Sequence, residues 1–323
     1  MNNNNNNNNI GISLFTITLL IPITLNIINN YKNKIIKVKE IWIYPIKSCK
    51  GISPISWKIS KRGFEYDRSF MLIDNNNKFI SQRTYPKMCF IETNIDINNN
   101  ILIIKAPGMK KELEISLTNE NGLEKVIVNI WGDECDAYVL DKDVCYWFNE
   151  YLGTNDIKLV KIADDTLRQT NPDYAPNSET GFSDGYPFLL TSIESLDDLN
   201  KRLPKPISML NFRPNIIVQG SKKPWCEDKW DQISFNNFVF MRVVKPCDRC
   251  QVPTIDLTTG DKDPNVTRVM KTFRTGKDCG FSNEKWNGSL FFGQNVDHYG
   301  WGVNVGKVIS QGDEVKVLTT KKF

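Results

Sequence analysis

Two cysteines with the spacing of metal ligands lie late in the chain, in the segment Lys245-Pro-Cys-Asp-Arg-Cys250. A lysine and an arginine lie beside the two thiols, and a nearby cation favours the thiolate, which is the form that binds metals and attacks electrophiles. Three chemistries use such a pair: half of a zinc site, a redox dithiol, or a single thiolate on a softer metal with the second cysteine nearby. The rest of the chain has to decide among them.

The other residues weaken the first two chemistries. A structural zinc ion needs four nitrogen or sulfur ligands, but no second closely spaced cysteine pair is present and His298 is the only histidine. We expect His298 to be a surface residue. A thioredoxin-type dithiol lies at a strand-to-helix junction, whereas this segment follows a predicted strand and leads into Pro253 and a turn at Thr259-Gly260. A thiolate on a soft metal fits best, with the other two chemistries as alternatives.

Length and composition restrict the class of protein. The 323 residues allow two domains with a sizeable core. A net charge of +4 is too small to indicate nucleic acid as a partner. The eight cysteines are spread irregularly through a chain of this size, which is typical of free thiols in a reducing compartment.

The N-terminal region predicts a tether to a membrane. Residues 1–9 are almost entirely asparagine and have nothing apolar to bury, so we expect disorder there. Residues 10–29 carry no charge and are long enough to cross a bilayer as a helix. Lysines follow this segment and no charged side chain precedes it, so the positive-inside rule leaves the remainder of the chain in the cytosol. A cleaved signal or an untranslocated apolar tail are the alternatives.

The pattern of apolar residues predicts a mainly β protein with a few helices, of the α+β class. We divide it into an N-terminal β-rich domain at residues 35–165 and a second domain at residues 166–320, which carries the cysteine pair. A polar stretch at 164–183 is interpreted as a linker or an active-site loop. Strands are expected at 35–43, 69–74, 78–82, 101–104, 113–115, 126–130, 187–190, 215–218, 238–244 and 315–318.

Helices are expected at three places. One begins at Asp141 or Asp143 and ends before Gly153, a second is opened by Thr191 with Glu194 as a capping-box partner, and a third covers 265–273. Residues 291–295 are interpreted as either a strand-turn or a polar loop that closes a pocket.

Several charged residues lie where regular structure breaks. Lys47 and Ser48 follow the first strand, in a turn whose N–H groups could face a phosphate. Arg68 and Arg213 lie in similar breaks, where an arginine can hold a phosphate bidentately. Asp184 precedes a buried strand, where a carboxylate could orient water or shuttle a proton. Taken singly, each also fits a solvated turn or a surface ion pair, such as one between the neighbouring Asp67 and Arg68.

Five segments in order resemble the MOSC-domain family, and among its members the mitochondrial amidoxime reducing components. They are Tyr44-Pro-Ile-Lys-Ser-Cys-Lys-Gly51, Asp67-Arg68, Phe182-Ser-Asp-Gly-Tyr-Pro187, Asn211-Phe-Arg-Pro-Asn215 and Pro246-Cys-Asp-Arg-Cys250. The resemblance covers roughly residues 35 to 320. It implies an N-terminal β-barrel MOSC domain and a β-barrel-like MOSC domain, preceded by a membrane helix.

The resemblance also implies a molybdenum cofactor, in which the metal is held by a molybdopterin. Cys250 matches the family's protein ligand to molybdenum, so Cys247 is left as its neighbour. Asp184 matches an acidic residue beside the metal and is assigned a catalytic role. The residues assigned to cofactor binding are Lys47, Ser48, Arg68, Asn211, Arg213 and Cys250 itself.

The implied activity is reduction of N-hydroxylated compounds such as amidoximes, hydroxylamines and N-oxides. Electrons would come from NADH through cytochrome b5 reductase and cytochrome b5. The implied location is the outer mitochondrial membrane, with the enzyme facing the cytosol. The alternative is a non-catalytic module that carries or binds the cofactor or sulfur, because MOSC domains also form part of molybdenum cofactor sulfurases.

Overall fold

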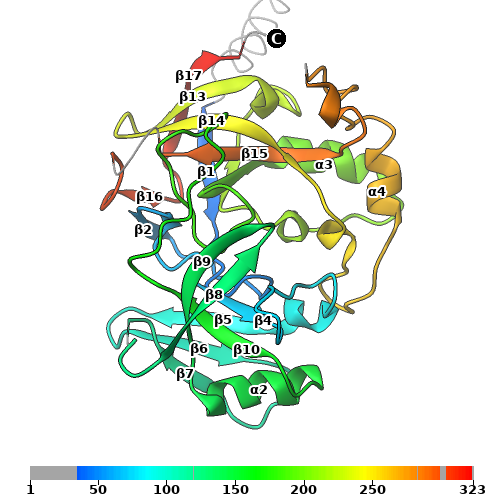
Figure 1. Ribbon diagram of the computed structural model, residues 1–323. Helices are drawn as coiled ribbons and strands as arrows, with labels where there is room; N and C mark the ends of the chain where they lie inside the picture. Colours follow the sequence, from blue (N-terminus) through cyan, green and yellow to red (C-terminus); the bar gives the residue numbers. More distant parts are fainter. Residues whose placement is uncertain (1–34, 119, 282, 299–302, 322–323) are drawn as a thin grey trace, which may run out of the picture. The chain divides into compact units, whose positions relative to one another are not determined.

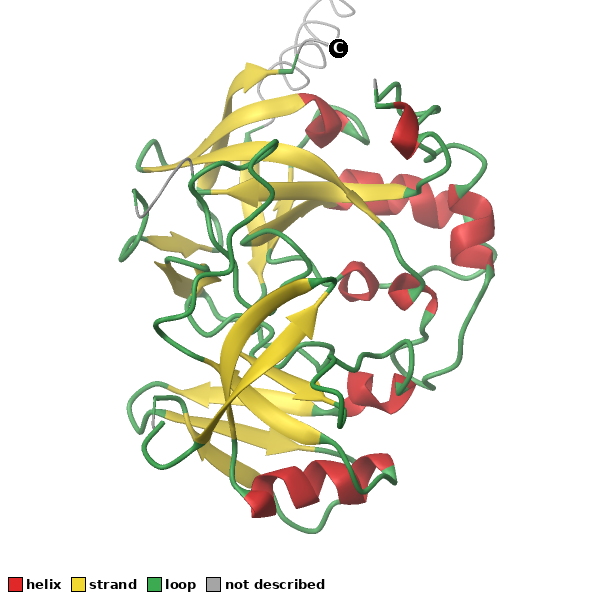
Figure 2. Cartoon of the chain, in the orientation of Figure 1, coloured by secondary structure: helices red, strands yellow, loops and turns green. Residues whose placement is uncertain are grey.

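The computed structural model describes residues 35–118, 120–281, 283–298 and 303–321. The predicted asparagine tract and membrane helix lie outside these residues. Within the described ranges, no helix is long and apolar enough to cross a membrane. Strands make up most of the regular structure, as Figure 2 shows, so the prediction of a mainly β fold with few helices is confirmed.

The largest sheet is a closed barrel of seven strands (Figure 1). Every neighbouring pair in it is antiparallel except β11 and β12, which are parallel. In order around the barrel the strands are β1 (Ile36–Ile41), β12 (Ile216–Gln219), β11 (Phe188–Ser192), β15 (Phe291–Asp297), β14 (Val239–Asp248), β13 (Trp230–Phe235) and β17 (Glu314–Thr320).

The barrel crosses the domain boundary that was placed between residues 165 and 166. Its strand β1 comes from the N-terminal region and pairs with β12 on one side and β17 on the other. Val38 and Ile41 face the core while Lys37 and Lys39 face solvent. Strict alternation would put positions 38 and 41 on opposite faces, and the register shift between Val38 and Glu40 returns Ile41 to the core side. Apolar side chains from all seven strands fill the interior.

The other strands form open sheets rather than a second closed barrel among the described residues. A four-stranded sheet has the order β4 (Phe70–Ile73), β10 (Lys158–Ile162), β9 (Asp133–Val139) and β8 (Glu124–Ile130). A three-stranded sheet contains β5 (Glu92–Asp96), β6 (Ile101–Lys105) and β7 (Leu113–Ser116). The last sheet contains β16 (Val308–Ser310), β2 (Ser56–Ser60) and β3 (Gly63–Phe64).

The helices lie close to their predicted positions. Helix α2 (Lys142–Leu152) ends at Gly153, whose φ of 72° gives the left-handed conformation expected of a glycine at this end. Helix α3 (Ile193–Arg202) is capped by Ser192 rather than Thr191, because β11 continues through Thr191 to Ser192. Helix α4 spans Asn265–Met270. Short 3₁₀ helices occupy Pro86–Phe90, Met209–Phe212, Cys226–Lys229, Val252–Thr254 and Glu284–Trp286.

Two predictions of local structure need correction. Residues 78–82 do not form a strand, because the segment makes two isolated bridges, from Lys78 to Asn129 and from Phe79 to Ile73, before the chain turns at Ser81. For residues 291–295 the strand is confirmed and the loop is wrong, because they lie inside β15 and pair with both β11 and β14.

Candidate functional site

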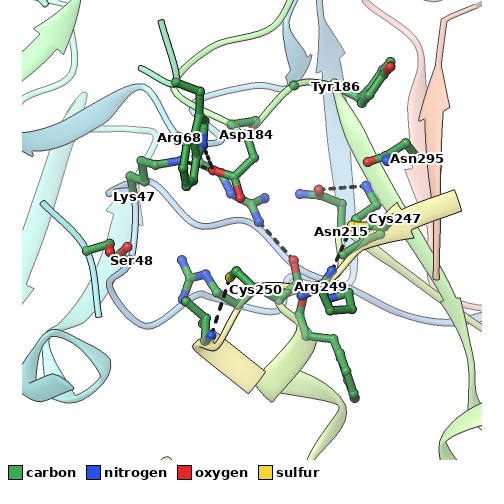
Figure 3. A pocket seen from close by; sticks show the side chains of 18 of the residues that line it. Lys47, Ser48, Arg68, Asp184, Tyr186, Asn215, Cys247, Arg249, Cys250 and Asn295 are labelled. Atoms are coloured by element: carbon green, nitrogen blue, oxygen red, sulfur yellow. Dashed lines mark hydrogen bonds and ion pairs between the residues drawn. The ribbon is translucent and has the colours of Figure 1, made fainter. Parts of the chain in front are cut away.

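Residues predicted from five separate segments line one pocket (Figure 3). Each of them lies in a loop next to a strand, so the sheets fix the points from which the loops start. Lys47 and Ser48 follow β1, Arg68 precedes β4, Asp184 precedes β11, Arg213 precedes β12 and Cys250 follows β14.

Three of these residues have a left-handed backbone, which residues other than glycine seldom adopt. The φ angles are 69° at Ser48, 46° at Arg68 and 56° at Arg213. Such conformations are unfavourable and concentrate where the surrounding structure holds a functional side chain in place. Their occurrence at three predicted binding residues of one pocket therefore favours a functional role for it.

Lys47 and Asp184 form the central ion pair of the pocket. Nζ of Lys47 lies 2.5 Å from Oδ1 of Asp184 and also donates to the carbonyl of Phe182 at 2.8 Å. Burial lowers the pKa of Lys47, and Asp184 opposes that shift. The carboxylate faces the pocket, with 70% of its side-chain surface exposed.

The pKa of Asp184 lies well below its usual range. The pocket walls remove part of the hydration of the carboxyl group, which by itself raises the pKa, but Lys47, the hydrogen bond from Trp131 and the charge of Arg68 together outweigh this effect. The indole Nε1 of Trp131 adds a hydrogen bond to Oδ1 at 3.0 Å. Asp184 is therefore an ionised hydrogen-bond acceptor at neutral pH.

Arg68 and Arg213 stack against the same aromatic ring. Each guanidinium carbon lies 4.2 Å from the centre of the Tyr44 ring. Asp67 does not form the surface ion pair that the sequence suggested, because it is buried and lies 2.6 Å from Nη1 of Arg68. Burial, with Arg68 nearby, lowers the pKa of Arg213 to about 10, and the guanidinium stays charged at pH 7. Two fixed cations thus face the pocket.

The two cysteines differ in what their sulfur atoms contact. Sγ of Cys247 accepts a hydrogen bond from the charged Nη1 of Arg249 at 2.9 Å, whereas the one that Sγ of Cys250 accepts within the described ranges comes from the neutral N–H of Val252 at 3.5 Å. The expected lowering of the thiol pKa by a nearby cation is wrong for Cys247, because burial raises its pKa more than Arg249 lowers it. The sulfur of Cys250 therefore has the weaker hydrogen bond and is the more available of the two for a metal.

The polar stretch at 164–183 holds the loop that carries Asp184. Arg168 is buried, and its guanidinium donates to the carbonyls of Gly181, Ser183 and Asp184. Asp133 neutralises it at 2.9 Å. Because Arg168 binds these four partners, the stretch holds the pocket loop in place and is not a simple linker.

Asn211 does not line the pocket, contrary to its assignment as a cofactor-binding residue. Its side-chain amide is buried and donates to the carbonyls of Pro253 at 3.1 Å and Ile255 at 2.8 Å. These bonds hold the turn that follows Cys250. Asn211 therefore positions the cysteine loop, and its neighbour Asn215 reaches the pocket instead.

The prediction that His298 lies on the surface is wrong. Its side chain is 2% exposed and packs edge-to-face against Phe188, with ring centres 5.1 Å apart. Burial lowers its pKa to about 4, so the ring is neutral at pH 7. It does not line the pocket.

Sequence analysis missed several residues of the pocket wall, among them Phe79, Ser81, Arg83 and Trp131. One signal was available, because a tryptophan followed by glycine directly after the predicted strand 126–130 is compatible with a large ring at a hairpin tip. The others reach the pocket through pairings between distant segments, which local patterns do not reveal.

The composition of the pocket fits an anionic group that carries a soft metal. One carboxylate, that of Asp184, faces five cationic side chains, those of Lys47, Arg68, Arg83, Arg213 and Arg249. Nη2 of Arg213 and Nε of Arg249 are buried without a hydrogen-bond partner in the described part of the chain. A thiolate is a soft ligand. Across residues 35–118, 120–281, 283–298 and 303–321, no group of three or more His, Cys, Asp or Glu could hold a metal ion alone.

Comparisons with known proteins support the motif-based resemblance. The MOSC N-terminal beta barrel domain matches residues 35–155, and the MOSC domain matches residues 177–316. The chain belongs to the MOSC-domain family. The resemblance inferred from the five segments is thereby confirmed.

Relatives within the MOSC-domain family carry two kinds of name. Mitochondrial amidoxime reducing component 2 of Rattus norvegicus is 34% identical, over 73% of this chain and 72% of that protein. Mitochondrial amidoxime-reducing component 1 of Homo sapiens is 29% identical, over 80% of this chain and 77% of that protein. Molybdenum cofactor sulfurase of Oryza sativa subsp. japonica is 29% identical over 79% of this chain, which spans only 33% of the sulfurase.

Proposed function

We propose that this protein is a molybdenum cofactor-dependent reductase of N-hydroxylated compounds, including amidoximes, hydroxylamines and N-oxides. The observation that carries the proposal is the pocket, in which a weakly engaged Cys250 thiol lies among five cations. The similarity to amidoxime reducing components over most of both chains supports this reductase activity over that of the sulfurases. The sulfurases align with this chain along only a third of their length.

Each residue of the pocket has a role in this proposal. Cys250 would supply the thiolate ligand, while Lys47, Ser48, Arg68 and Arg213 would hold the pterin and its phosphate through charge-assisted hydrogen bonds. When bound, the cofactor supplies the transfer of two electrons and accepts oxygen. The chain itself supplies position and electrostatics.

Asp184 would orient the substrate or a water molecule. Reducing an amidoxime to an amidine consumes two electrons and two protons, breaks the N–O bond and releases water. Because its low pKa leaves Asp184 ionised, the carboxylate accepts a hydrogen bond from a substrate N–H or O–H instead of storing a proton. Lys47 fixes the direction of that acceptor at 2.5 Å.

We propose that NADH is the electron source, through cytochrome b5 reductase and cytochrome b5. We also propose that residues 10–29 anchor the enzyme in the outer mitochondrial membrane with its pocket in the cytosol. The uncharged run of apolar residues and the lysines after it support the anchor and its orientation.

The test uses the full chain, expressed with cofactor supply and purified in detergent. Molybdenum per chain is measured by mass spectrometry, and benzamidoxime reduction is followed with cytochrome b5, its reductase and NADH. We expect about one molybdenum per chain and NADH-dependent benzamidine formation. Molybdenum without turnover would support the carrier module instead, and folded protein without molybdenum would refute both.

A further inference from the structure

Trp131 lies at the tip of the hairpin that joins β8 to β9. Its φ is 58° and that of Gly132 is 100°, so the tip is a two-residue turn of positive φ, as tight hairpins prefer. The side chain is 53% exposed. A large ring at such a tip gains little from burial, and its position needs another explanation.

Hydrogen bonds order the hairpin tip, and one of them joins it to the wall of the pocket. The backbone N–H of Asn129 donates to the carbonyl of Asn77 at 3.0 Å, and Oδ1 of Asn129 accepts from the N–H of Gly132 at 3.1 Å. The indole Nε1 of Trp131 donates to Asp184 at 3.0 Å. These bonds hold an exposed ring in one place, whereas most exposed side chains keep their rotamer freedom.

Two further side chains extend the ring into a larger surface. The guanidinium of Arg83 lies 4.5 Å from the centre of the Trp131 ring, and the Phe79 ring centre lies 5.1 Å from it. Nε of Arg83 donates to the hydroxyl of Ser81 at 3.1 Å, which fixes the guanidinium. Trp131, Arg83 and Phe79 line the same pocket as Cys250 and together form what we call the aromatic wall.

We propose that Trp131 is a specificity-determining residue, whose ring binds the flat conjugated part of an aromatic N-hydroxylated substrate within reach of Asp184. This inference rests on the proposed reductase function. Aromatic rings in contact gain attraction beyond the area they bury. The aromatic wall thus favours aromatic amidoximes over small aliphatic ones.

A second role would also explain Trp131. Its N–H could serve only to hold the Asp184 carboxylate, and the ring would then contact no substrate. Two substitutions separate these roles. Trp131→Phe keeps an aromatic ring but removes the N–H, whereas Trp131→Asn removes the ring, and asparagine tolerates the left-handed backbone of this turn.

The experiment compares benzamidoxime with acetamidoxime as substrates of the cofactor-loaded full chain. In Trp131→Asn we expect kcat/KM for benzamidoxime, divided by kcat/KM for acetamidoxime, to fall about tenfold. The fall should come from a higher KM for benzamidoxime, because the contact with the ring is lost. In Trp131→Phe the ratio should stay within about threefold of wild type. Tyr146→Leu is the matched control, because Tyr146 is an exposed ring on α2 outside the pocket.

Binding of benzamidoxime to the oxidised protein without electron donor, measured by calorimetry, tests the aromatic wall independently of turnover. We expect the affinity to weaken about tenfold in Trp131→Asn only. If wild type binds benzamidoxime but reduces neither substrate, the reductase proposal fails while the binding surface stands. Equal effects of both Trp131 variants on both substrates, or wild-type affinity in Trp131→Asn with its Tm unchanged, would overturn the inference.

Discussion

Replacing each cysteine of the Cys-x-x-Cys segment by alanine should separate folding from metal binding. Among the residues that the structure describes, Sγ of Cys250 accepts one hydrogen bond, from the uncharged N–H of Val252 at 3.5 Å. Cys250→Ala therefore removes almost nothing from the fold and should cost less than about 1 kcal/mol of stability. If Cys250 is the ligand, the same change removes the protein's only bond to the metal.

Cys247→Ala should have the opposite effects, lowering the stability of the fold and leaving metal binding intact. It removes the 2.9 Å hydrogen bond from Arg249, whose guanidinium still donates to the carbonyl of Phe212 at 3.0 Å. Because the bond involves a charged donor in a half-buried place, we expect a loss of about 1–2 kcal/mol in stability. That corresponds to a decrease in Tm of about 1.5–3 °C for a chain of this size. Bound molybdenum should stay near the wild-type amount.

The assay measures three quantities on the same preparations: molybdenum per chain, benzamidoxime turnover and Tm. We expect Cys250→Ala to lose more than 90% of turnover, which is more than a tenfold decrease in rate, or about 1.4 kcal/mol. The Tm of the cofactor-free protein should be the same in this variant as in wild type. Cys247→Ala should keep more than about a third of the wild-type turnover. Equal loss of turnover in both variants would restore the redox dithiol as the better interpretation, and full turnover in Cys250→Ala would refute the ligand assignment.

Three further substitutions test the pocket and its supports. Lys47→Met should reduce retained molybdenum about tenfold after dialysis, because a buried cation that faces the phosphate is lost, whereas Lys50→Met, at an exposed lysine outside this pocket, should retain it. Burial raises the pKa of Glu227 to about 7, so ionisation of this carboxyl group opposes folding. Between pH 4.5 and 7.5, the free energy of unfolding of wild type in urea should therefore fall by about 3 kcal/mol relative to that of Glu227→Gln. A difference between the two proteins that does not change with pH would contradict this. Gly63→Ala should lower stability by more than about 2 kcal/mol in thermal unfolding, because φ is 120° and a Cβ would lie 2.6 Å from the carbonyl oxygen of Pro187; an unchanged Tm would show that the backbone moves freely there.

Local patterns predicted much of the regular structure. The stripe of α2 and the glycine at its end, at Gly153, were sufficient to place that helix. They failed for residues 78–82, which were predicted to be a strand. In the structure β10 occupies one edge of β4, and only Ile80 and Lys78 bond near the other edge before Ser81 turns the chain toward the pocket. Pairing between distant segments decided this outcome.

The same limit applies to the candidate site. The motifs brought Lys47, Arg68, Arg213 and Cys250 together correctly as lining residues of one pocket. The motif around Asn211 did not show that this side chain faces the cysteine loop. Which way a polar side chain points depends on the carbonyls that the folded chain places around it, and those came from residues about forty positions away.

The arrangement of the strands implies that neither half of the chain forms the pocket alone. Lys47 and Arg68 come from the N-terminal half, whereas Asp184, Arg213 and Cys250 come from the C-terminal half. The division also runs through the barrel, because β1 pairs with both β12 and β17. Without β1, these two strands would present unpaired edges, which favour aggregation over binding. The two MOSC domains are therefore one folding and binding unit, in which a cofactor that contacts both halves would stabilise the barrel closure that positions its own ligands.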